Sequence, residues 1–542
     1  MKKNKKSLIL LFLFVCLCQL VFPAGDSWAK QPVPVRNVII LIADGAGGAH
    51  SALTRWYKGG PLALDEIVSG GIKTYASDSI ITDSASAATA YATGYKTDAG
   101  SVAMFPDKYA MPGMSLDQND RYKPLSTVLE GAKLLGKSTG LVATVNIQHA
   151  TPAGFSTHLN DRNNYIILAK QQVYQQIDVV FGGGRMYLLP KELGGKREDG
   201  LNLLDVLKSQ GCEIVENTRQ MKDSKAKKIW GLFADGDMSY DLDRDPFKEP
   251  GLAEMTAKAL EILSANPKGF FLMVEGSKID HAAHANDPVG VVSDMLAFDE
   301  AVKAALDFSK KDQNTLVLAF GDHGTGGMTI GNSSVSYNGF LPARLVEPLK
   351  NAKYTAQGLQ KLLNPDRSNL VDILKQYYGL PDLSQEEIDA LLNARSSDLA
   401  PAIGRLLSKR AGIGWTTGGH TGEDLFLYSF GPQKPTGLLD NTEIAKKVAA
   451  AFGFDLDKNT AALFVNLKDK AAELGYTMKL TPKGKTPQIL LENGKTSVLL
   501  FIDTNLMYAD GREIKLKSIT VSAFGKAYAS REVVDYMIKG KK

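Results

Sequence analysis

Short apolar runs separated by longer amphipathic stretches are the feature that most limits how this chain can fold. Between Asn37 and about Gly453, five such runs have the length and composition of strands: 38–42, 140–145, 179–181, 270–274 and 315–320. The segments that connect them include helical patterns at 251–263 and 289–308. Strands that alternate with helices are typical of parallel sheets, because a crossover helix returns the chain to the starting edge. The sequence therefore predicts an α/β domain with a central, mainly parallel sheet flanked by helices.

The first 29 residues have the three parts of a signal peptide. Four lysines precede an apolar core at 8–22 that only Gln19 interrupts, and Ser27-Trp28-Ala29 forms a small-x-small cleavage site. The core is too short to span a bilayer comfortably, although an uncleaved membrane anchor remains the alternative. We therefore expect cleavage after Ala29, export to the periplasm or the extracellular space, and no stable membrane insertion afterwards.

Two further segments depart from the α/β pattern, so we divide the mature chain into a domain at 30–453 and an accessory region at 454–542. An insertion at 329–411 interrupts the domain, and a capping box at Ser384 and Glu387 predicts a helix within it. In the accessory region, Asn493-Gly494 and Asp510-Gly511 each lie between β-type runs. Such dipeptides favour two-residue hairpins, so we expect a small β-rich unit and, for the insertion, a cap beside the site.

Charge and cysteine content narrow the class of protein further. The whole chain carries a net charge of +4 and residues 1–29 carry +3, from four lysines and Asp26, so about +1 remains after cleavage. This near-neutral balance does not favour a nucleic acid or an anionic membrane as partner. Cys212 is the one cysteine of the mature chain, so no intramolecular disulfide can form. Stability must then come from the buried core and from bound metals.

Metal-type side chains follow three of the predicted strands. Asp44 comes after the first run, Glu275 after the run at 270–274, and Asp322 and His323 after the run at 315–320. Ligands of open α/β sheets collect beyond the carboxyl ends of the strands. The sequence therefore predicts a metal site at that edge of the sheet.

A second cluster of metal-type residues follows Glu275 in the chain. Asp280 and His284 are spaced i, i+4, so on a helix they share one face and can hold one ion. His420 lies in a glycine-rich loop, 418–422, from which it could complete this site. Mixed imidazole and carboxylate ligands suit zinc, whereas sites made of oxygen ligands suit magnesium.

Ser84 is the candidate nucleophile. Asp83 and Ser84 stand at the head of a run of small helix formers, which places the hydroxyl at a helix N-terminus where an oxyanion is favoured. A zinc ion there would lower the pKa of the serine without a histidine base. No G-x-S-x-G sequence surrounds this serine, so a Ser-His-Asp triad is not required.

Several separated blocks carry these residues in one order along the chain. These blocks are Asp44-Gly45, 82–94, 149–152, 181–185, 275–284, Asp322-His323 and 419–421. Through them, residues 37–452 resemble the alkaline phosphatase family of metal-dependent phosphomonoesterases. The resemblance implies two zinc ions and one magnesium ion. It matches Asp280, His284 and His420 to the first zinc site, Asp44, Asp322 and His323 to the second, and Asp44, Thr151 and Glu275 to the magnesium site. It also matches Arg162 to the arginine that clamps phosphate oxygens.

At two positions this chain differs from the enterobacterial members of the family, which have an aspartate beside the magnesium site and a lysine near the phosphate. His149 and His281 stand at these positions, as in animal-type members, and we expect both to lie beside the phosphate. Because magnesium binds imidazole poorly, another divalent metal could replace it. An ordinary imidazole loses its charge above about pH 6.5, so we also expect His281 to release phosphate more easily in alkaline solution.

The sequence therefore predicts hydrolysis of phosphate monoesters through a phosphoserine intermediate, with release of an alcohol and inorganic phosphate. The substrates would be small molecules, and the family resemblance leaves a homodimer open. The alternatives are a phosphodiesterase or sulfatase of the same superfamily, or a periplasmic phosphate- or metal-binding protein without turnover. The sequence does not identify the natural substrate.

Overall fold

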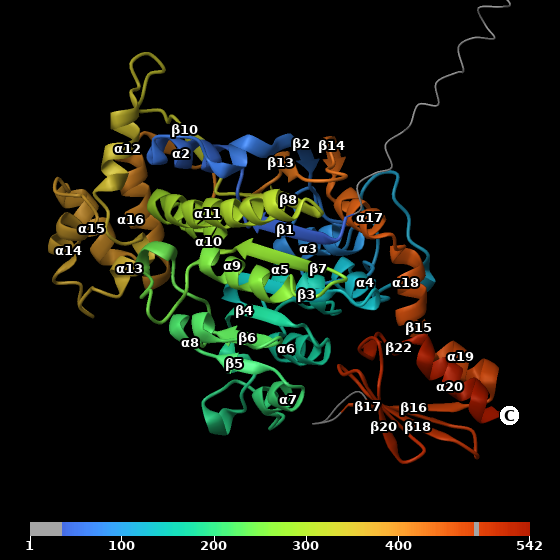
Figure 1. Ribbon diagram of the computed structural model, residues 1–542. Helices are drawn as coiled ribbons and strands as arrows, with labels where there is room; N and C mark the ends of the chain where they lie inside the picture. The colour runs from blue at the N-terminus through green and yellow to red at the C-terminus, as the bar shows by residue number, and fades with distance from the viewer. Residues whose placement is uncertain (1–34, 482–486, 542) are drawn as a thin grey trace, which may run out of the picture. The chain divides into compact units, whose positions relative to one another are not determined.

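The computed structural model describes residues 35–481 and 487–541, and Figure 1 shows how its helices and strands are arranged. The predicted signal peptide, 1–29, lies outside the described residues. Within the part that the structure describes, no helix is both long enough and apolar enough to cross a membrane.

A ten-stranded sheet forms the centre of the protein, in the order β14-β2-β13-β8-β1-β7-β3-β4-β6-β5. All five predicted strands belong to it: β1 (Asn37–Ala43), β3 (Ser138–Asn146), β4 (Val179–Gly183), β7 (Phe270–Gly276) and β8 (Thr315–Gly321). The other five are β2 (Val68–Lys73), β5 (Glu213–Val215), β6 (Ile229–Leu232), β13 (Leu425–Phe430) and β14 (Gly437–Asp440). Only β13 runs antiparallel to its neighbours β8 and β2, so the predicted mainly parallel α/β sheet is confirmed.

The central strands are apolar along their whole length because helices cover both faces of the sheet. In β1, Val38, Ile40 and Ile42 pack into one apolar core, whereas Ile39 and Leu41 pack into another on the opposite face. The first core receives α3 (Ser84–Thr93), α4 (Val128–Leu134), α5 (Ala150–Ser156) and α17 (Asn441–Phe452). The second receives α9 (Leu252–Leu263) and α11 (Pro288–Asp312), which confirm the two predicted helices.

The predicted insertion is helical and leaves the domain between two short paired strands. β10 (Thr329–Ile330) pairs with β11 (Ile413–Gly414). Between them lie α12 (Pro342–Lys350), α13 (Ala356–Gln360), α14 (Leu370–Tyr377), α15 (Gln385–Asn393) and α16 (Ser396–Arg410). The capping box before α15 is confirmed, because the Ser384 hydroxyl accepts from the Glu387 amide at 3.2 Å and the Glu387 carboxylate accepts from the Ser384 amide at 3.1 Å.

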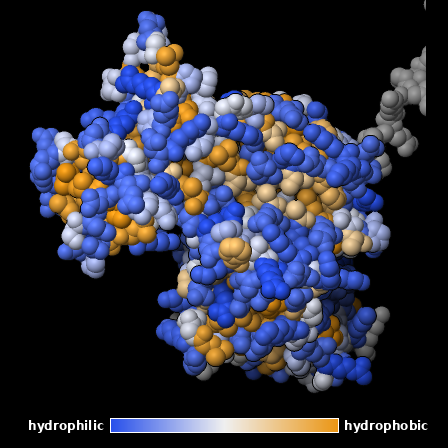
Figure 2. All heavy atoms as spheres, turned by 60° about the vertical axis from the view of Figure 1, so that its left-hand side comes forward, coloured by the Kyte–Doolittle hydropathy of each residue, from blue (hydrophilic) through white to orange (hydrophobic). Residues whose placement is uncertain are grey.

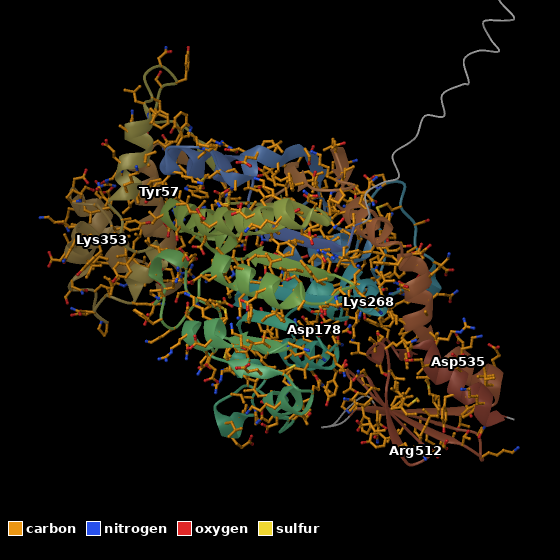
Figure 3. The ribbon with its side chains drawn as sticks, in the orientation of Figure 1. Tyr57, Asp178, Lys268, Lys353, Arg512 and Asp535 are labelled. Atoms are coloured by element: carbon orange, nitrogen blue, oxygen red, sulfur yellow. The ribbon has the colours of Figure 1, made fainter. Side chains whose placement is uncertain are left out.

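The insertion has an apolar core of its own that also includes residues of the main domain. Leu53 of α2 (Gly48–Lys58) and Val289 of α11 pack into it. Figure 3 labels Tyr57 on α2 and Lys353 on the insertion, and Tyr57 packs against this core. Some apolar side chains remain exposed on the insertion, among them Leu341, Val371 and Leu392, and Figure 2 shows apolar surface over this part of the molecule.

The residues after Gly453 form helices around a small antiparallel sheet. The five strands are β16 (Thr477–Thr481), β17 (Gln488–Glu492), β18 (Ser497–Phe501), β19 (Leu506–Ala509) and β20 (Arg512–Lys515). A second sheet joins β15 (Val465–Asn466), β22 (Lys526–Ala529) and β21 (Val521–Ala523), and the helices are α18 (Leu456–Leu463), α19 (Leu467–Leu474) and α20 (Arg531–Lys541). The predicted β-rich unit is therefore present.

Both predicted hairpins are present, but only one of them has the predicted two-residue turn. Asp510 and Gly511 form a two-residue turn with φ of 50° and 71°, as a type I′ hairpin requires. At Asn493-Gly494 the flanking pair is Glu492 and Ser497, so the turn has four residues, 493–496. The Asn493 side chain accepts from the amides of residues 495 and 496, and this local bonding stabilises the longer turn.

The main domain and the C-terminal unit share polar contacts. Lys170 on α6 (Tyr165–Tyr174) donates to the Ile502 carbonyl at 2.8 Å, and Gln171 donates to Asp503 at 2.8 Å. The ring of Phe464 lies 4.5 Å from that of His158. The boundary at residue 453 therefore stays a prediction, since packing continues across it.

Candidate metal centre and active site

The carboxyl ends of three adjacent strands bring the predicted metal-type residues together. In the sheet register, Ala43 of β1 lies beside Gly276 of β7 and Gly321 of β8. The side chains at these strand ends, together with those of the nearby loops, form three groups: Asp280, His284 and His420; Asp44, Asp322 and His323; and Asp44, His149 and Glu275. Within each group the ligand atoms lie within 4.8 Å of one another, so each group could hold a metal ion.

The first group joins helix α10 (Lys278–His284) to the short strand β12 (His420–Thr421). The Nε2 atom of His284 lies 3.2 Å from Asp280 Oδ2 and 3.2 Å from His420 Nε2. Each histidine bonds a backbone carbonyl through Nδ1, His284 to Gly418 at 2.6 Å and His420 to Thr82 at 3.0 Å. A neutral imidazole that donates through Nδ1 has a free lone pair on Nε2, so both Nε2 atoms are presented to a shared metal.

The charges of the first group also favour a cation. Burial opposes ionisation of Asp280, yet the hydrogen bond from His284 and the nearby His323 hold its pKa well below the ordinary range. Burial lowers the pKa of His284, but the hydrogen bond to Asp280, the charge of Asp280 and the hydrogen bond to the Gly418 carbonyl together raise it to about 9. A proton and a metal therefore compete for His284 Nε2 at neutral pH.

The second group is fully buried and holds carboxylate oxygens that have no hydrogen-bond partner among the described residues. These are both oxygens of Asp44 and Oδ2 of Asp322. His323 Nε2 lies 3.3 Å from Asp322 Oδ2 and 3.6 Å from Asp44 Oδ1. Burial, followed by repulsion from Asp322, raises the pKa of Asp44 well above its usual value. Bound cations would remove this cost, so the donor set fits a metal.

The third group shares Asp44 and adds Glu275 and His149. Both Glu275 oxygens and the Thr151 hydroxyl, all buried, also lack hydrogen-bond partners in the described chain. Burial raises the pKa of Glu275 to about 7. His149 accepts from the Arg162 guanidinium through Nε2 at 3.1 Å, and burial lowers its pKa to about 3. His149 thus lies between the third group and Arg162, whereas the sequence predicted its place beside the magnesium site and the phosphate but not its contact with Arg162.

Ser84 occupies the predicted helix N-terminus and faces the second group. Asp83 is the N-cap of α3, and its carboxylate accepts from the Ser86 amide at 2.9 Å. The Ser84 hydroxyl is buried and lies 3.1 Å from His323 Nε2. The predicted nucleophile therefore lies within hydrogen-bond distance of His323, one of the predicted zinc ligands.

Sequence reasoning missed the role of Asp83 in holding Arg162. The second carboxylate oxygen of Asp83 accepts from Arg162 at 3.0 Å and from the Gly100 amide at 3.1 Å. Since His149 accepts from the other terminal nitrogen, both ends of the guanidinium are fixed. In the sequence, Asp83 stands out only as a residue at the head of a helix. No local pattern links it with Arg162, which follows 79 positions later.

His281 lies near His149 but does not titrate as expected. The two rings meet edge to face with centroids 5.8 Å apart, and His281 Nδ1 accepts from the Lys278 ammonium at 3.2 Å. Burial and the Lys278 charge lower the pKa of His281 to about 4. The expectation that it loses a charge near pH 6.5 is therefore wrong. Asp237, also missed, lies 3.9 Å from His281 and is held by two bonds from Asn146.

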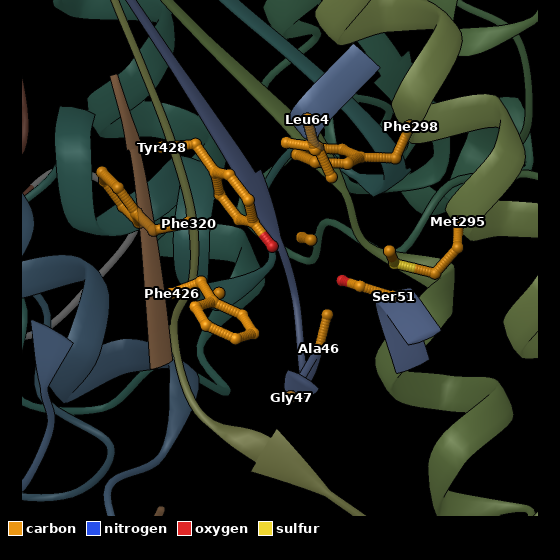
Figure 4. Close-up of a pocket in the computed structure, with 11 residues that line it drawn as sticks. Ala46, Gly47, Ser51, Leu64, Met295, Phe298, Phe320, Phe426 and Tyr428 are labelled. Atoms are coloured by element: carbon orange, nitrogen blue, oxygen red, sulfur yellow. The ribbon is translucent and has the colours of Figure 1, made fainter. Parts of the chain in front are cut away.

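A small cavity lies behind the loop that follows Asp44, and Figure 4 shows its lining. Its volume is about 10 Å³, and apolar side chains such as Leu64, Met295 and Phe298 form most of its wall. This space suits at most one water molecule, so we assign it no ligand.

The residues and their spacing match one protein family over most of the chain. The family model described as alkaline phosphatase matches residues 35–454. The chain belongs to the alkaline phosphatase family. As an alkaline phosphatase it is an enzyme, and the family activity is hydrolysis of phosphate monoesters. The predicted family, fold and enzyme class are thereby confirmed.

Individual relatives agree with this assignment. Alkaline phosphatase 3 of Bacillus subtilis (strain 168) is 39% identical over 448 residues, which cover 78% of this chain and 90% of the relative. The crystal structure of Thermus thermophilus alkaline phosphatase has a TM-score of 0.69 at 27% identity, and the match covers 80% of this chain and 96% of the Thermus chain. A structure of TAB5 alkaline phosphatase, a histidine-to-aspartate variant with Mg bound in its M3 site, has a TM-score of 0.57 at 26% identity. The match covers 78% of this chain and 100% of the TAB5 chain.

Proposed function

We propose that this alkaline phosphatase hydrolyses phosphate monoesters through a phosphoserine intermediate on Ser84. The placement of the Ser84 hydroxyl supports this most directly. It is buried at the N-terminus of α3 and lies 3.1 Å from His323, in the second group of metal-type residues. A protein that only binds phosphate or metal would not need a hydroxyl in this position.

We further propose that the three groups hold two zinc ions and one magnesium ion. Asp280, His284 and His420 would hold the first zinc, and Asp44, Asp322 and His323 the second; Asp44, Thr151 and Glu275 would hold the third ion. The mixture of imidazole and carboxylate suits zinc in the first two groups, and the oxygen ligands of the third suit magnesium. When bound, such ions supply Lewis acidity that favours the ionised serine and the charge on the leaving oxygen.

Individual groups of the protein then have distinct roles in the reaction. The Ser84 oxygen forms a bond to phosphorus as the bond to the leaving alcohol oxygen breaks. Water subsequently attacks the phosphoserine, which frees Ser84 and inorganic phosphate. Arg162 would donate two parallel hydrogen bonds to phosphate oxygens, and its contacts with Asp83 and His149 hold the guanidinium for this role. The N-terminus of α3 favours the negative charge near Ser84.

We propose that the third site accepts a divalent metal other than magnesium more readily than an aspartate-bearing relative does. His149 lies in the group with Asp44 and Glu275, and imidazole suits transition metals. The TAB5 relative has Mg in its M3 site after a histidine-to-aspartate change, which supports a comparable role for His149 here.

The setting of the enzyme is also proposed from its sequence. We infer export to the periplasm or the extracellular space after cleavage at Ala29, and small phosphate monoesters as substrates. The mature net charge of about +1, from +4 less the +3 of residues 1–29, does not favour nucleic acids. A homodimer is a further proposal that sedimentation velocity would test.

Release of p-nitrophenol from its phosphate ester, with and without chelator, tests the activity. Parallel assays with a phosphodiester and a sulfate ester separate the rival enzymes, and absence of turnover on all three would favour the binding protein. Trapping in acid with labelled phosphate tests the intermediate. We expect the label on Ser84, and a loss of at least about a thousandfold in kcat for Ser84→Ala.

Ser86→Ala is the matched control, because Ser86 lies on the same helix turn but bonds Asp83 rather than His323. It should still form the phosphoenzyme. Label on Ser86 or Ser79 would show that the nucleophile is assigned wrongly.

A further inference from the structure

Asn286 stands directly after the helix that carries Asp280 and His284. It is buried, with 4% of its surface exposed, and its φ of 49° places it in the left-handed region. Asparagine enters this region more readily than most residues other than glycine. The residue thus turns the chain between α10 and α11, where Asp287 is the next N-cap.

The Asn286 side chain joins the two pieces of chain that build the first metal group. Its amide nitrogen donates to the Ala283 carbonyl at 3.1 Å, on α10, and to the Thr417 carbonyl at 2.9 Å, in the segment that leads to His420. The neighbouring carbonyl, Gly418, receives the hydrogen bond from His284. Two consecutive carbonyls of the segment are therefore bonded to residues in or just after α10.

In the part of the chain that the structure describes, the direct hydrogen bonds between the segment that carries His420, residues 415–421, and the chain from α10 to Asn286 come from His284 and Asn286. Residues 416 and 418 are exposed, and Gly418 and Gly419 give it a flexible backbone. Its other hydrogen bonds include those from the amides of residues 416 and 417 to the Gly326 carbonyl, at 3.1 and 3.2 Å. These bonds, and the pairing of β12 with β9 (Gly324–Thr325), hold the segment against a loop that itself reaches α10, because the Thr325 hydroxyl donates to Asp280 at 2.6 Å. The direct link between the segment and α10 comes from His284 and Asn286.

Helix α16 of the insertion supports Asn286 from behind. The Ser408 hydroxyl donates to the Asn286 carbonyl at 3.4 Å, and Arg405 lies 3.5 Å from its side-chain oxygen. Trp415, at the start of the His420 segment, donates to the same Ser408 hydroxyl at 2.9 Å. The insertion thus contacts both sides of the junction between α10 and this segment.

We infer that Asn286 is a positioning residue that sets the separation of His284 and His420, and thereby the affinity of the first group for its metal. The inference rests on the proposed function, in which this group holds a zinc ion. Partners that orient metal ligands change metal affinity by about 10- to 100-fold when they are removed. Asn286 acts one step further out, so we expect an effect of about tenfold.

Two substitutions separate the side chain from the backbone. Asn286→Gly keeps the left-handed backbone and removes the amide. Asn286→Asp keeps the shape and tolerates the same φ, but its ionised carboxylate only accepts hydrogen bonds and would face the Thr417 and Ala283 carbonyls. Asn332→Gly is the matched control, because Asn332 makes the same kind of bond, to the Ile413 carbonyl at 3.1 Å on β11.

Zinc titration of the metal-free full chain against a competing chelator measures the outcome, and cobalt(II) absorption reports the ligand geometry. We expect Asn286→Gly to weaken one zinc equivalent about tenfold and to alter the cobalt spectrum, with the other equivalents unchanged. Asn286→Asp should weaken the same equivalent further, and Asn332→Gly should match the wild type. Unchanged affinity in both Asn286 variants, or equal weakening of every equivalent, would overturn the inference. Wild-type protein that binds zinc in this pattern but hydrolyses no phosphate ester would instead contradict the proposed function.

Discussion

In the metal-free enzyme, Glu275 should increasingly destabilise the native state as the pH rises from about 4.5 to about 7, relative to an uncharged glutamine at the same position. Without metal, burial raises the pKa of the Glu275 carboxyl from 4.5 to about 7. The native chain therefore keeps a proton that the unfolded chain releases in this range. Since the native state binds more protons at Glu275 there, the contribution of Glu275 to the free energy of unfolding falls with rising pH and stays low above pH 7.

The size of this effect follows from the change in pKa. One pKa unit corresponds to about 1.4 kcal/mol, so a carboxyl moved from 4.5 to about 7 costs about 3 kcal/mol once it is ionised. The unfolding entropy is about 2 cal/mol/K per residue, or about 1 kcal/mol/K for a chain of this size. The Glu275 contribution should thus lower the melting temperature by about 3 °C. Asp44, whose pKa is raised in the same direction by burial, adds to the loss.

The assay is calorimetry of chelator-treated protein between pH 4.5 and 8, with Glu275→Gln as control. Glutamine keeps the shape and removes the titration, so the difference between the two proteins isolates Glu275 from all other groups. Zinc- and magnesium-loaded wild type should not show this loss, because the cations balance the ionised carboxylates. If the pH profiles of stability of the two metal-free proteins ran parallel across this range, the reasoning about Glu275 would be refuted.

Four further outcomes are expected. Chelator should lower the melting temperature of the native enzyme while reductant leaves it unchanged, because the described chain holds one free cysteine, Cys212; a shift with reductant alone would contradict this. The double change His149→Asp with His281→Lys should shift activation toward magnesium and tighten inhibition by phosphate, and unchanged metal preference and inhibition would count against both roles. Asp83→Ala should free Arg162 and so raise KM for p-nitrophenyl phosphate about tenfold, which corresponds to about 1.4 kcal/mol of binding free energy. An unchanged KM would show that the ion pair does not position the arginine. Deletion of 467–542 should lower the melting temperature, since it removes the partners of Lys170 and Gln171, but should leave zinc content and phosphoenzyme formation intact; loss of either would place this unit in the active site.

Local patterns in the chain were sufficient for the central strands and for most of the site. A strand such as β1, buried on both faces, must be apolar throughout, so its run and the Asp44 that ends it are visible without a structure. The i, i+4 spacing of Asp280 and His284 likewise reports a shared helix face. Shorter strands such as β5, with three residues, carry too little pattern to be found.

The resemblance to a family added what spacing alone did not contain. His420 follows His284 by 136 positions, and nothing between them indicates that their Nε2 atoms lie 3.2 Å apart. The three-metal assignment and the role of Arg162 depended on matched blocks, and they stay proposals. The family, the fold and the enzyme class are confirmed by the comparisons.

Contacts between distant side chains were decided only by the tertiary structure. The ion pair of Asp83 with Arg162 and the bond from Asn286 to the Thr417 carbonyl join segments that lie far apart in the sequence. The burial that lowers the pKa of His281 depends on the same packing. The same is true of the four-residue turn at 493–496, where strand pairing set the loop length. Sequence periodicity reports which residues are buried and which backbone angles they favour. It carries no record of which buried groups meet, because that depends on how all the elements pack at once.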